Sequence, residues 1–180
     1  MMTKESINQI FTIGHSTRPL DSFVSILKSY GINLVVDIRS IPRSWHNPQF
    51  NKETLPAALA LHGIEYIHMA GLGGLRKSHP DSLNLGWHNA SFRSYADYMQ
   101  TNEFKSSLET LVEMSAKNNL VIMCAETLPW RCHRSLVADA LLIRGIKVQD
   151  IFKEGVSKEH KLTPFAQVRG MEITYPASVE

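Results

Sequence analysis

The segment CAETLPWRCHR, residues 124–134, contains two cysteines, a glutamate, a histidine and two arginines. A cysteine near a helix start and beside cations forms a thiolate more readily than an isolated cysteine, and a thiolate can act as a nucleophile or a redox centre. Cations flank Cys132 on both sides, so we expect Cys132 to be the thiol with the lower pKa. Cys124 directly follows the apolar run LVIM and can instead be a buried packing residue.

The spacing of these cysteines and arginines does not match either of two familiar kinds of site. Structural zinc sites typically use cysteines about two to four residues apart, whereas seven residues separate Cys124 from Cys132. A phosphatase-type loop of the form C-x5-R would place an arginine six residues after Cys124, but that residue is Trp130. We therefore predict no metal and no cofactor, although the two cysteines and His15 could still converge in three dimensions.

Other ionisable and hydroxyl side chains also follow predicted strands, at the point where each strand ends. In a parallel sheet these ends meet at one edge, where ligands bind. Arginines and glycine-rich backbone there would bind a planar or tetrahedral anion, and histidine or carboxylate groups would transfer protons. Our candidates for thiol chemistry and proton transfer are Cys132, Cys124, Glu126, His15 and Asp37. Our candidates for binding an anionic substrate are Ser16, Arg39, Arg43, Ser44, Arg76, His133 and Arg134.

Several candidates also have a purely structural interpretation. Asp37 can pair with Arg39 or cap the following turn. His15 and Ser16 can cap the helix that follows them. The glycine-rich residues 71–74 lack the G-x-G-x-x-G spacing of a dinucleotide-binding loop and are more typical of a tight turn. In this interpretation, arginine–carboxylate pairs only hold the loops together.

Strands and helices that alternate along the chain would position these residues. Short apolar runs typical of strands occupy residues 9–14, 33–39, 65–69, 120–125 and 146–151. Apolar residues recur at helical spacing in residues 19–32, 51–64, 91–99, 104–117 and 134–144. In the second of these helices we expect Asn51 or Thr54 to be the N-terminal cap.

This alternation predicts an α/β fold with a mostly parallel, Rossmann-like sheet and helices on both faces, because each parallel crossover needs a helix. Strand order does not follow from the sequence. No internal repeat or linker is visible, so we predict one domain over residues 1–180, with a core of about residues 11–151. The tail, residues 152–180, shows no clear period.

Composition and charge narrow the class of protein. With 43% apolar and 20% charged residues, the chain resembles an ordinary globular domain. Two cysteines are too few for a disulfide scaffold, and a net charge of +2 indicates no particular partner. The N-terminus lacks the roughly 7–15-residue apolar stretch of a secretory signal, and no apolar run approaches the ~20 residues of a membrane span. We expect a cytoplasmic protein without membrane contact.

Several motifs occur together in a fixed order: TIGHST, DIRSIPRS, NPQF, GIEYIH, LGGLRK, YADYM and CAETLPWRCHR. Over residues 11–151 they resemble the domain of unknown function 488 family. The resemblance implies a cytoplasmic prokaryotic α/β protein and carries no established activity. One position departs from the family pattern, because Asp150 stands where a histidine is expected. The recurring polar positions of the family match His15, Ser16, Asp37, Arg39, Pro42, Ser44, Arg76, Cys124, Glu126, Cys132, His133 and Arg134.

The pattern favours an enzyme of unassigned reaction that acts on a phosphorylated or nucleotide-like substrate through a reactive thiol. The alternative is a module that binds nucleotide or nucleic-acid phosphates through arginines, with the cysteines as packing residues. In the segment PRSWHNPQF, Trp45 and Phe50 could stack on a base or simply close the pocket. The possible partners are therefore a small anionic substrate or nucleic acid, and the sequence does not indicate an oligomeric state.

Overall fold

Five of the six strands in the central sheet run parallel, as the alternation of strands and helices predicts. The computed structural model describes residues 8–178. The main sheet has the strand order β3-β2-β4-β1-β5-β6, and β6 pairs antiparallel with β5. The predicted α/β fold class is therefore confirmed. The strands are β1 (Gln9–Gly14), β2 (Leu34–Asp37), β3 (Glu65–His68), β4 (Leu120–Cys124), β5 (Lys147–Lys153) and β6 (Val156–Glu159).

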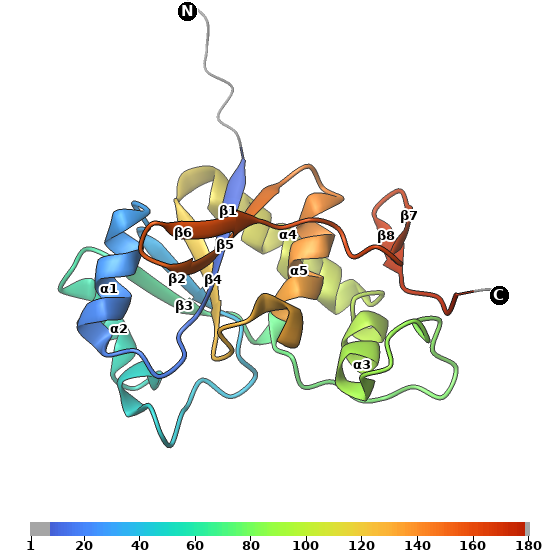
Figure 1. Ribbon diagram of the computed structural model, residues 1–180, viewed down its shortest axis with the longest axis horizontal. Coiled ribbons are helices and arrows are strands. Elements are labelled where there is room, and N and C mark those ends of the chain that lie inside the picture. The colour runs from blue at the N-terminus through green and yellow to red at the C-terminus, as the bar shows by residue number, and fades with distance from the viewer. Residues whose placement is uncertain (1–7, 179–180) are drawn as a thin grey trace, which may run out of the picture.

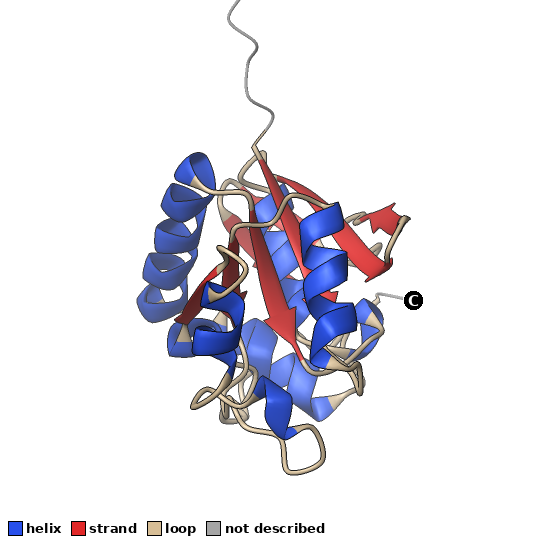
Figure 2. Ribbon diagram, turned by 90° about the vertical axis from the view of Figure 1, so that its left-hand side faces the viewer, coloured by secondary structure: helices blue, strands red, loops and turns tan. Residues whose placement is uncertain are grey.

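Helices cover both faces of this sheet (Figures 1 and 2). Apolar side chains of α1 and α2 pack on one face, and those of α3, α4 and α5 pack on the other. Successive residues of β4 point to opposite faces, so Met123 packs with the α1–α2 layer and Cys124 with the α3–α5 layer. The helices are α1 (Leu20–Ser29), α2 (Leu55–Ala60), α3 (Ala90–Tyr98), α4 (Asn102–Lys117) and α5 (Arg134–Leu142).

The carboxyl ends of β1 and β4 lie side by side at the switch point of the sheet. The chain leaves β1 toward α1 on one face and leaves β4 toward α5 on the other. Ligands of open α/β sheets bind where the connections diverge in this way. The His15 backbone N–H donates to the Cys124 carbonyl oxygen at 2.8 Å. A Cβ atom on Gly14 would lie 1.8 Å from the Glu126 carbonyl oxygen, so glycine is required for this close approach.

The tail contains strands that the sequence does not reveal. β6 extends the main sheet, whereas β7 (Gln167–Arg169) and β8 (Glu172–Thr174) form a separate antiparallel hairpin. Ile173 and Tyr175 are buried against the α3–α5 side of the core. These three strands have only three or four residues each, which is too short for a period to be recognised.

Neither of the first two helices has a hydrogen-bonded side-chain cap. α1 begins after Pro19, with no capping hydrogen bond from His15 or Ser16. Thr54 is the N-cap residue of α2, but its hydroxyl donates to carbonyl oxygens of the preceding turn instead. The polar residues that follow β1 are therefore not helix caps.

A buried carboxylate on α5 ties the tail to the core. Asp139 is fully buried and accepts hydrogen bonds from His160 Nε2 at 2.8 Å, Thr163 Oγ1 at 2.7 Å and the Tyr175 hydroxyl at 2.7 Å. The other ring nitrogen of His160 lies 3.6 Å from a carboxylate oxygen of Asp150. Burial alone would lower the pKa of His160, but the hydrogen bonds to Asp139 and Asp150 raise it to about 9.

We expect this cluster to make the free energy of unfolding fall as the pH rises above neutrality. The folded protein binds the His160 proton more tightly than the unfolded chain, whose histidine pKa is about 6.5. The stabilisation, on the order of 2 kcal/mol, is therefore complete below about pH 6 and is lost as the pH rises through about 9. Urea unfolding at about pH 6 and about pH 10 should show this loss in the wild type and a smaller one in His160→Gln. The control is His62→Gln, because His62 is exposed, and it should lose as much stability as the wild type does. If His160→Gln also loses as much stability as the wild type, His160 is not the group responsible.

Candidate functional site

The two thiols lie in contact between the end of β4 and the start of α5. Cys124 and Cys132 are free thiols and buried, and their Sγ atoms are 2.9 Å apart. Arg134 Nη1 donates to Cys124 Sγ at 2.9 Å. The same guanidinium, which is completely buried, donates to the carbonyl oxygens of Glu126 at 2.7 Å and Thr127 at 3.1 Å. The loop after β4 therefore holds a fixed positive charge against Cys124.

These contacts make Cys124 the thiolate of the pair. Burial alone would raise the pKa of Cys124, but the hydrogen bond from Cys132 and the charge of Arg134 lower it to about 7. The hydrogen bond to Cys124 and burial raise the pKa of Cys132 well above its usual value, since two adjacent sulfurs do not both ionise. The expectation that Cys132 is the lower-pKa thiol is wrong, because the Arg134 side chain points at Cys124.

His133 provides a second acceptor for the Cys132 proton. Burial lowers the pKa of His133 to about 4, so its ring is neutral. Nε2 donates to the Ile38 carbonyl oxygen at 2.9 Å, which leaves Nδ1 unprotonated, 3.4 Å from Cys132 Sγ. A Cβ atom on Gly74 would lie 2.6 Å from this Nδ1, so the glycine-rich turn packs directly over the ring. The result is a chain of contacts from Cys124 through Cys132 to His133.

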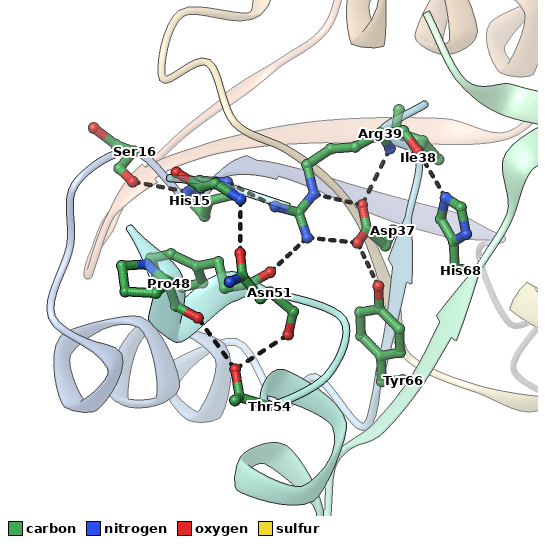
Figure 3. Close-up of polar contacts among 12 residues, drawn as sticks. His15, Ser16, Asp37, Ile38, Arg39, Pro48, Asn51, Thr54, Tyr66 and His68 are labelled. Atoms are coloured by element: carbon green, nitrogen blue, oxygen red, sulfur yellow. Dashed lines mark hydrogen bonds and ion pairs between the residues drawn. The ribbon is translucent and has the colours of Figure 1, made fainter. Parts of the chain in front are cut away.

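Asp37 and Arg39 form a buried ion pair at the end of β2 (Figure 3). Arg39 Nε donates to Oδ1 at 2.9 Å and Nη2 donates to Oδ2 at 2.7 Å. The Tyr66 hydroxyl donates to the same carboxylate, and Arg39 Nη2 also donates to the Phe50 carbonyl oxygen at 2.6 Å. Burial and the hydrogen bond to Asp37 raise the pKa of Tyr66. Asp37 is thus occupied by structural contacts on both oxygens.

His15 is bound to this ion pair through Arg39 (Figure 3). Its Nδ1 donates to the Ser16 carbonyl oxygen at 2.8 Å, and its Nε2 accepts from Arg39 Nη1 at 3.2 Å. Burial lowers the pKa of His15 to about 4, so the ring is neutral at pH 7. Both nitrogens have partners, and the ring stacks on Phe50 with centroids 4.3 Å apart. His15 is therefore placed to orient Arg39 rather than to take a proton.

Both thiols face a cavity of about 420 Å³ at this edge of the sheet, which we call the thiol cavity. It also has cationic side chains and an apolar rim. Eight of the predicted site residues line it: Cys124, Cys132, Glu126, His15, Arg39, Arg43, Ser44 and His133. Its other side chains include Ser40, Ile41, Leu75, Ser91, Phe92 and Arg131.

The family model of the domain of unknown function DUF488 matches residues 19–141. The chain belongs to the DUF488 family. Comparison with curated proteins and with solved structures found no match. The DUF488 segment contains the Asp37–Arg39 pair and both thiols, while His15 lies just before it. Membership in DUF488 assigns no activity, so the chemistry of the site has to be inferred from its geometry.

Four predicted site residues of this DUF488 chain lie outside the cavity lining. Asp37 and Arg134 sit behind it, where they hold Arg39 and Cys124. Ser16 does not line the cavity and has a left-handed backbone, with φ of 53°. The Arg76 guanidinium lies over the Tyr98 ring, 3.6 Å from its centroid, and donates to two carbonyl oxygens. Arg76 thus closes the turn after β3 rather than facing a ligand.

Several side chains that line the cavity are not among the site residues predicted from the sequence. Arg131 has a sequence signal, because it lies in the segment CAETLPWRCHR next to Cys132. Ile41 and Leu75 are 63% and 71% exposed, but this exposure cannot be read from the sequence, and isolated exposed apolar side chains are common on protein surfaces. Ser91 and Phe92 lie on α3, and no local pattern places that helix beside the thiols.

Residues 8–178 contain no group of three or more histidine, cysteine, aspartate or glutamate side chains arranged to hold a metal ion. None of the helices among these residues has both the length and the apolar character needed to span a bilayer.

Proposed function

We propose that the protein is an enzyme that uses the Cys124 thiolate as a nucleophile on a small anionic substrate in the thiol cavity. The observation that carries the proposal is the buried Arg134 guanidinium, 2.9 Å from one sulfur of a thiol pair that lines this cavity. Desolvating a guanidinium costs several kcal/mol, which packing cysteines alone would not require. A pKa of about 7 keeps much of Cys124 in the reactive form at neutral pH.

The lining of the cavity favours an anion of small size. Arg131 brings a guanidinium group to it, and Ser40 and Ser44 bring hydroxyls. Arg39 and Arg43 add positive charge, although their guanidinium groups are paired with Asp37 and Glu53. Planar and tetrahedral anions match such donors. A volume of about 420 Å³ is that of a small-molecule site.

Binding of a nucleic-acid backbone has less support. Arg43 pairs with Glu53 at 2.5 Å, Arg76 covers Tyr98, and Arg134 is buried. A polyanion needs a row of free surface cations, because its affinity comes from neutralising several phosphates. The predicted arginines do not form such a row.

Bond formation at Cys124 would also change the protonation state of the neighbouring Cys132. As the thiolate forms a bond to the electrophilic atom, the bond to the leaving group breaks and its electron pair departs with that group. Cys132 is held protonated by the charge on Cys124, and that charge disappears in this step. The Cys132 proton can then pass to the leaving group. Water would release the intermediate: its oxygen bonds to the electrophilic atom, the bond from that atom to Cys124 Sγ breaks with its electron pair returning to sulfur, and a water proton returns to Cys132.

Alkylation by iodoacetamide, followed for each cysteine by mass spectrometry on the folded protein, tests this proposal. Cys124 should react with a half-maximal rate near pH 7, whereas Cys132 should remain unreactive until Cys124 has been alkylated. Inorganic phosphate should slow the reaction at Cys124. The Cys132→Ala variant should shift the Cys124 profile to higher pH, because one hydrogen bond to the thiolate is lost. If both thiols react only after unfolding, the cysteines are packing residues and the proposal is wrong.

A further inference from the structure

A second cavity adjoins the thiol cavity and is lined largely by aromatic rings. Its volume is about 400 Å³. Phe92 and Arg131 line both cavities, so the two spaces meet at these side chains. We call this second space the aromatic cavity; its rings are Trp87, Phe92, Trp130 and Phe165.

Trp87 forms a fixed wall of the aromatic cavity. Its ring centroid lies 5.1 Å from that of Phe92 at 88° and 4.8 Å from that of Phe165 at 72°. Both are favourable edge-to-face contacts. The Trp87 carbonyl oxygen accepts from Arg93 Nε at 3.2 Å and Nη2 at 3.0 Å. The indole is thus held in place before any ligand arrives.

The indole N–H of Trp87 is a donor without an acceptor. Nε1 is buried and makes no hydrogen bond within residues 8–178. A buried polar group of this kind destabilises the protein. Because Nε1 is buried, a ligand in the cavity would contact the Trp87 ring rather than this N–H.

Trp130 and Arg131 supply the remaining parts of a site for an aromatic anion. Trp130 lies at the edge of the cavity with 61% of its surface exposed, so its ring is available for stacking. The Arg131 side chain makes no hydrogen bond or ion pair within the described chain, unlike Arg39, Arg43 and Arg134. It is therefore the cation that remains available where the two cavities meet.

We propose that the aromatic cavity binds the base of a mononucleotide whose phosphate lies at Arg131, toward Cys124. This inference rests on the proposed function, because it names the class of anion that the thiol cavity would receive. A nucleotide combines a planar ring that stacks on the aromatic side chains and an anionic group for Arg131. A phosphate or sugar phosphate would leave the rings without a ligand.

Calorimetric titration of the full chain with adenosine and uridine 5′-monophosphates tests the inference, with ribose 5-phosphate as the ligand that lacks a base. Ribose 5-phosphate should bind about tenfold more weakly than the better nucleotide. Trp130→Ala should weaken nucleotide binding by about tenfold and leave ribose 5-phosphate unaffected.

The matched control is Trp45→Ala, because Trp45 is 94% exposed and lines neither cavity. It should bind nucleotide as the wild type does. Equal affinity for nucleotide and ribose 5-phosphate, or no effect of Trp130→Ala, would overturn the inference while leaving the proposed thiol chemistry intact. Nucleotide binding that leaves alkylation of Cys124 unchanged would overturn the placement of the phosphate toward the thiols. Failure of the proposed function is recognised separately, by an inert Cys124 in the absence of any ligand.

Discussion

Replacing Arg134 with methionine should slow the alkylation of Cys124 at about pH 7 by tenfold or more. The guanidinium is the only cation within hydrogen-bonding distance of this sulfur in the described chain, and without it the buried thiolate loses both a charge and a donor. The pKa of Cys124 should therefore rise, and the pH of half-maximal alkylation should rise with it. The measurement is the pH profile of alkylation, compared with that of the wild type.

The same substitution should also reduce stability, by about 3 kcal/mol, because the carbonyl oxygens of Glu126 and Thr127 lose their buried donor. The pH profile separates the two effects, since lost packing alone would not move a midpoint. Arg144→Met removes a partly buried arginine just after α5 and should leave the Cys124 profile unchanged. An unchanged profile in Arg134→Met would mean that Arg134 only supports the loop.

Local patterns in the sequence are sufficient to predict the strands and helices and the edge of the sheet at which the site lies. β2 and β4 are continuous apolar runs because both are buried on two faces, which is the signature of central parallel strands. Polar residues directly after such runs must collect at one edge of the sheet. The positions of Cys124, His15 and Arg39 at this edge could therefore be predicted.

The roles of individual side chains could not be predicted, because they depend on contacts between distant segments. Cys132 has cationic neighbours in sequence, yet the nearest guanidinium reaches Cys124, ten residues before Arg134. Strand order depends on which strands pair, and local periodicity is the same for any order. Phe92, which lies on α3, lines the thiol cavity only because that helix packs against the α5 side of the core.

From the sequence, a pair between Asp37 and Arg39 is one of two structural roles open to Asp37, and the structure shows this pair to be buried. Asp37→Asn should lower the free energy of unfolding by about 3–5 kcal/mol, because it leaves the charge of Arg39 buried without a counterion. Three donor atoms of Arg39 and the Tyr66 hydroxyl converge on the Asp37 carboxylate, and an amide cannot accept them all. Denaturant unfolding measures the loss.

Two further variants show whether the loss comes from the uncompensated charge. Glu53→Gln breaks the Arg43 pair, in which both side chains are more than half exposed, and should leave stability unchanged. The double variant Asp37→Leu, Arg39→Met removes both buried charges and should recover part of the stability lost in Asp37→Asn. Recovery would show that the ion pair serves to position His15 and the loop after β2 rather than to stabilise the fold. A double variant less stable than Asp37→Asn would show instead that the hydrogen bonds of the pair, including the one from Arg39 to Phe50, are themselves a main source of stability.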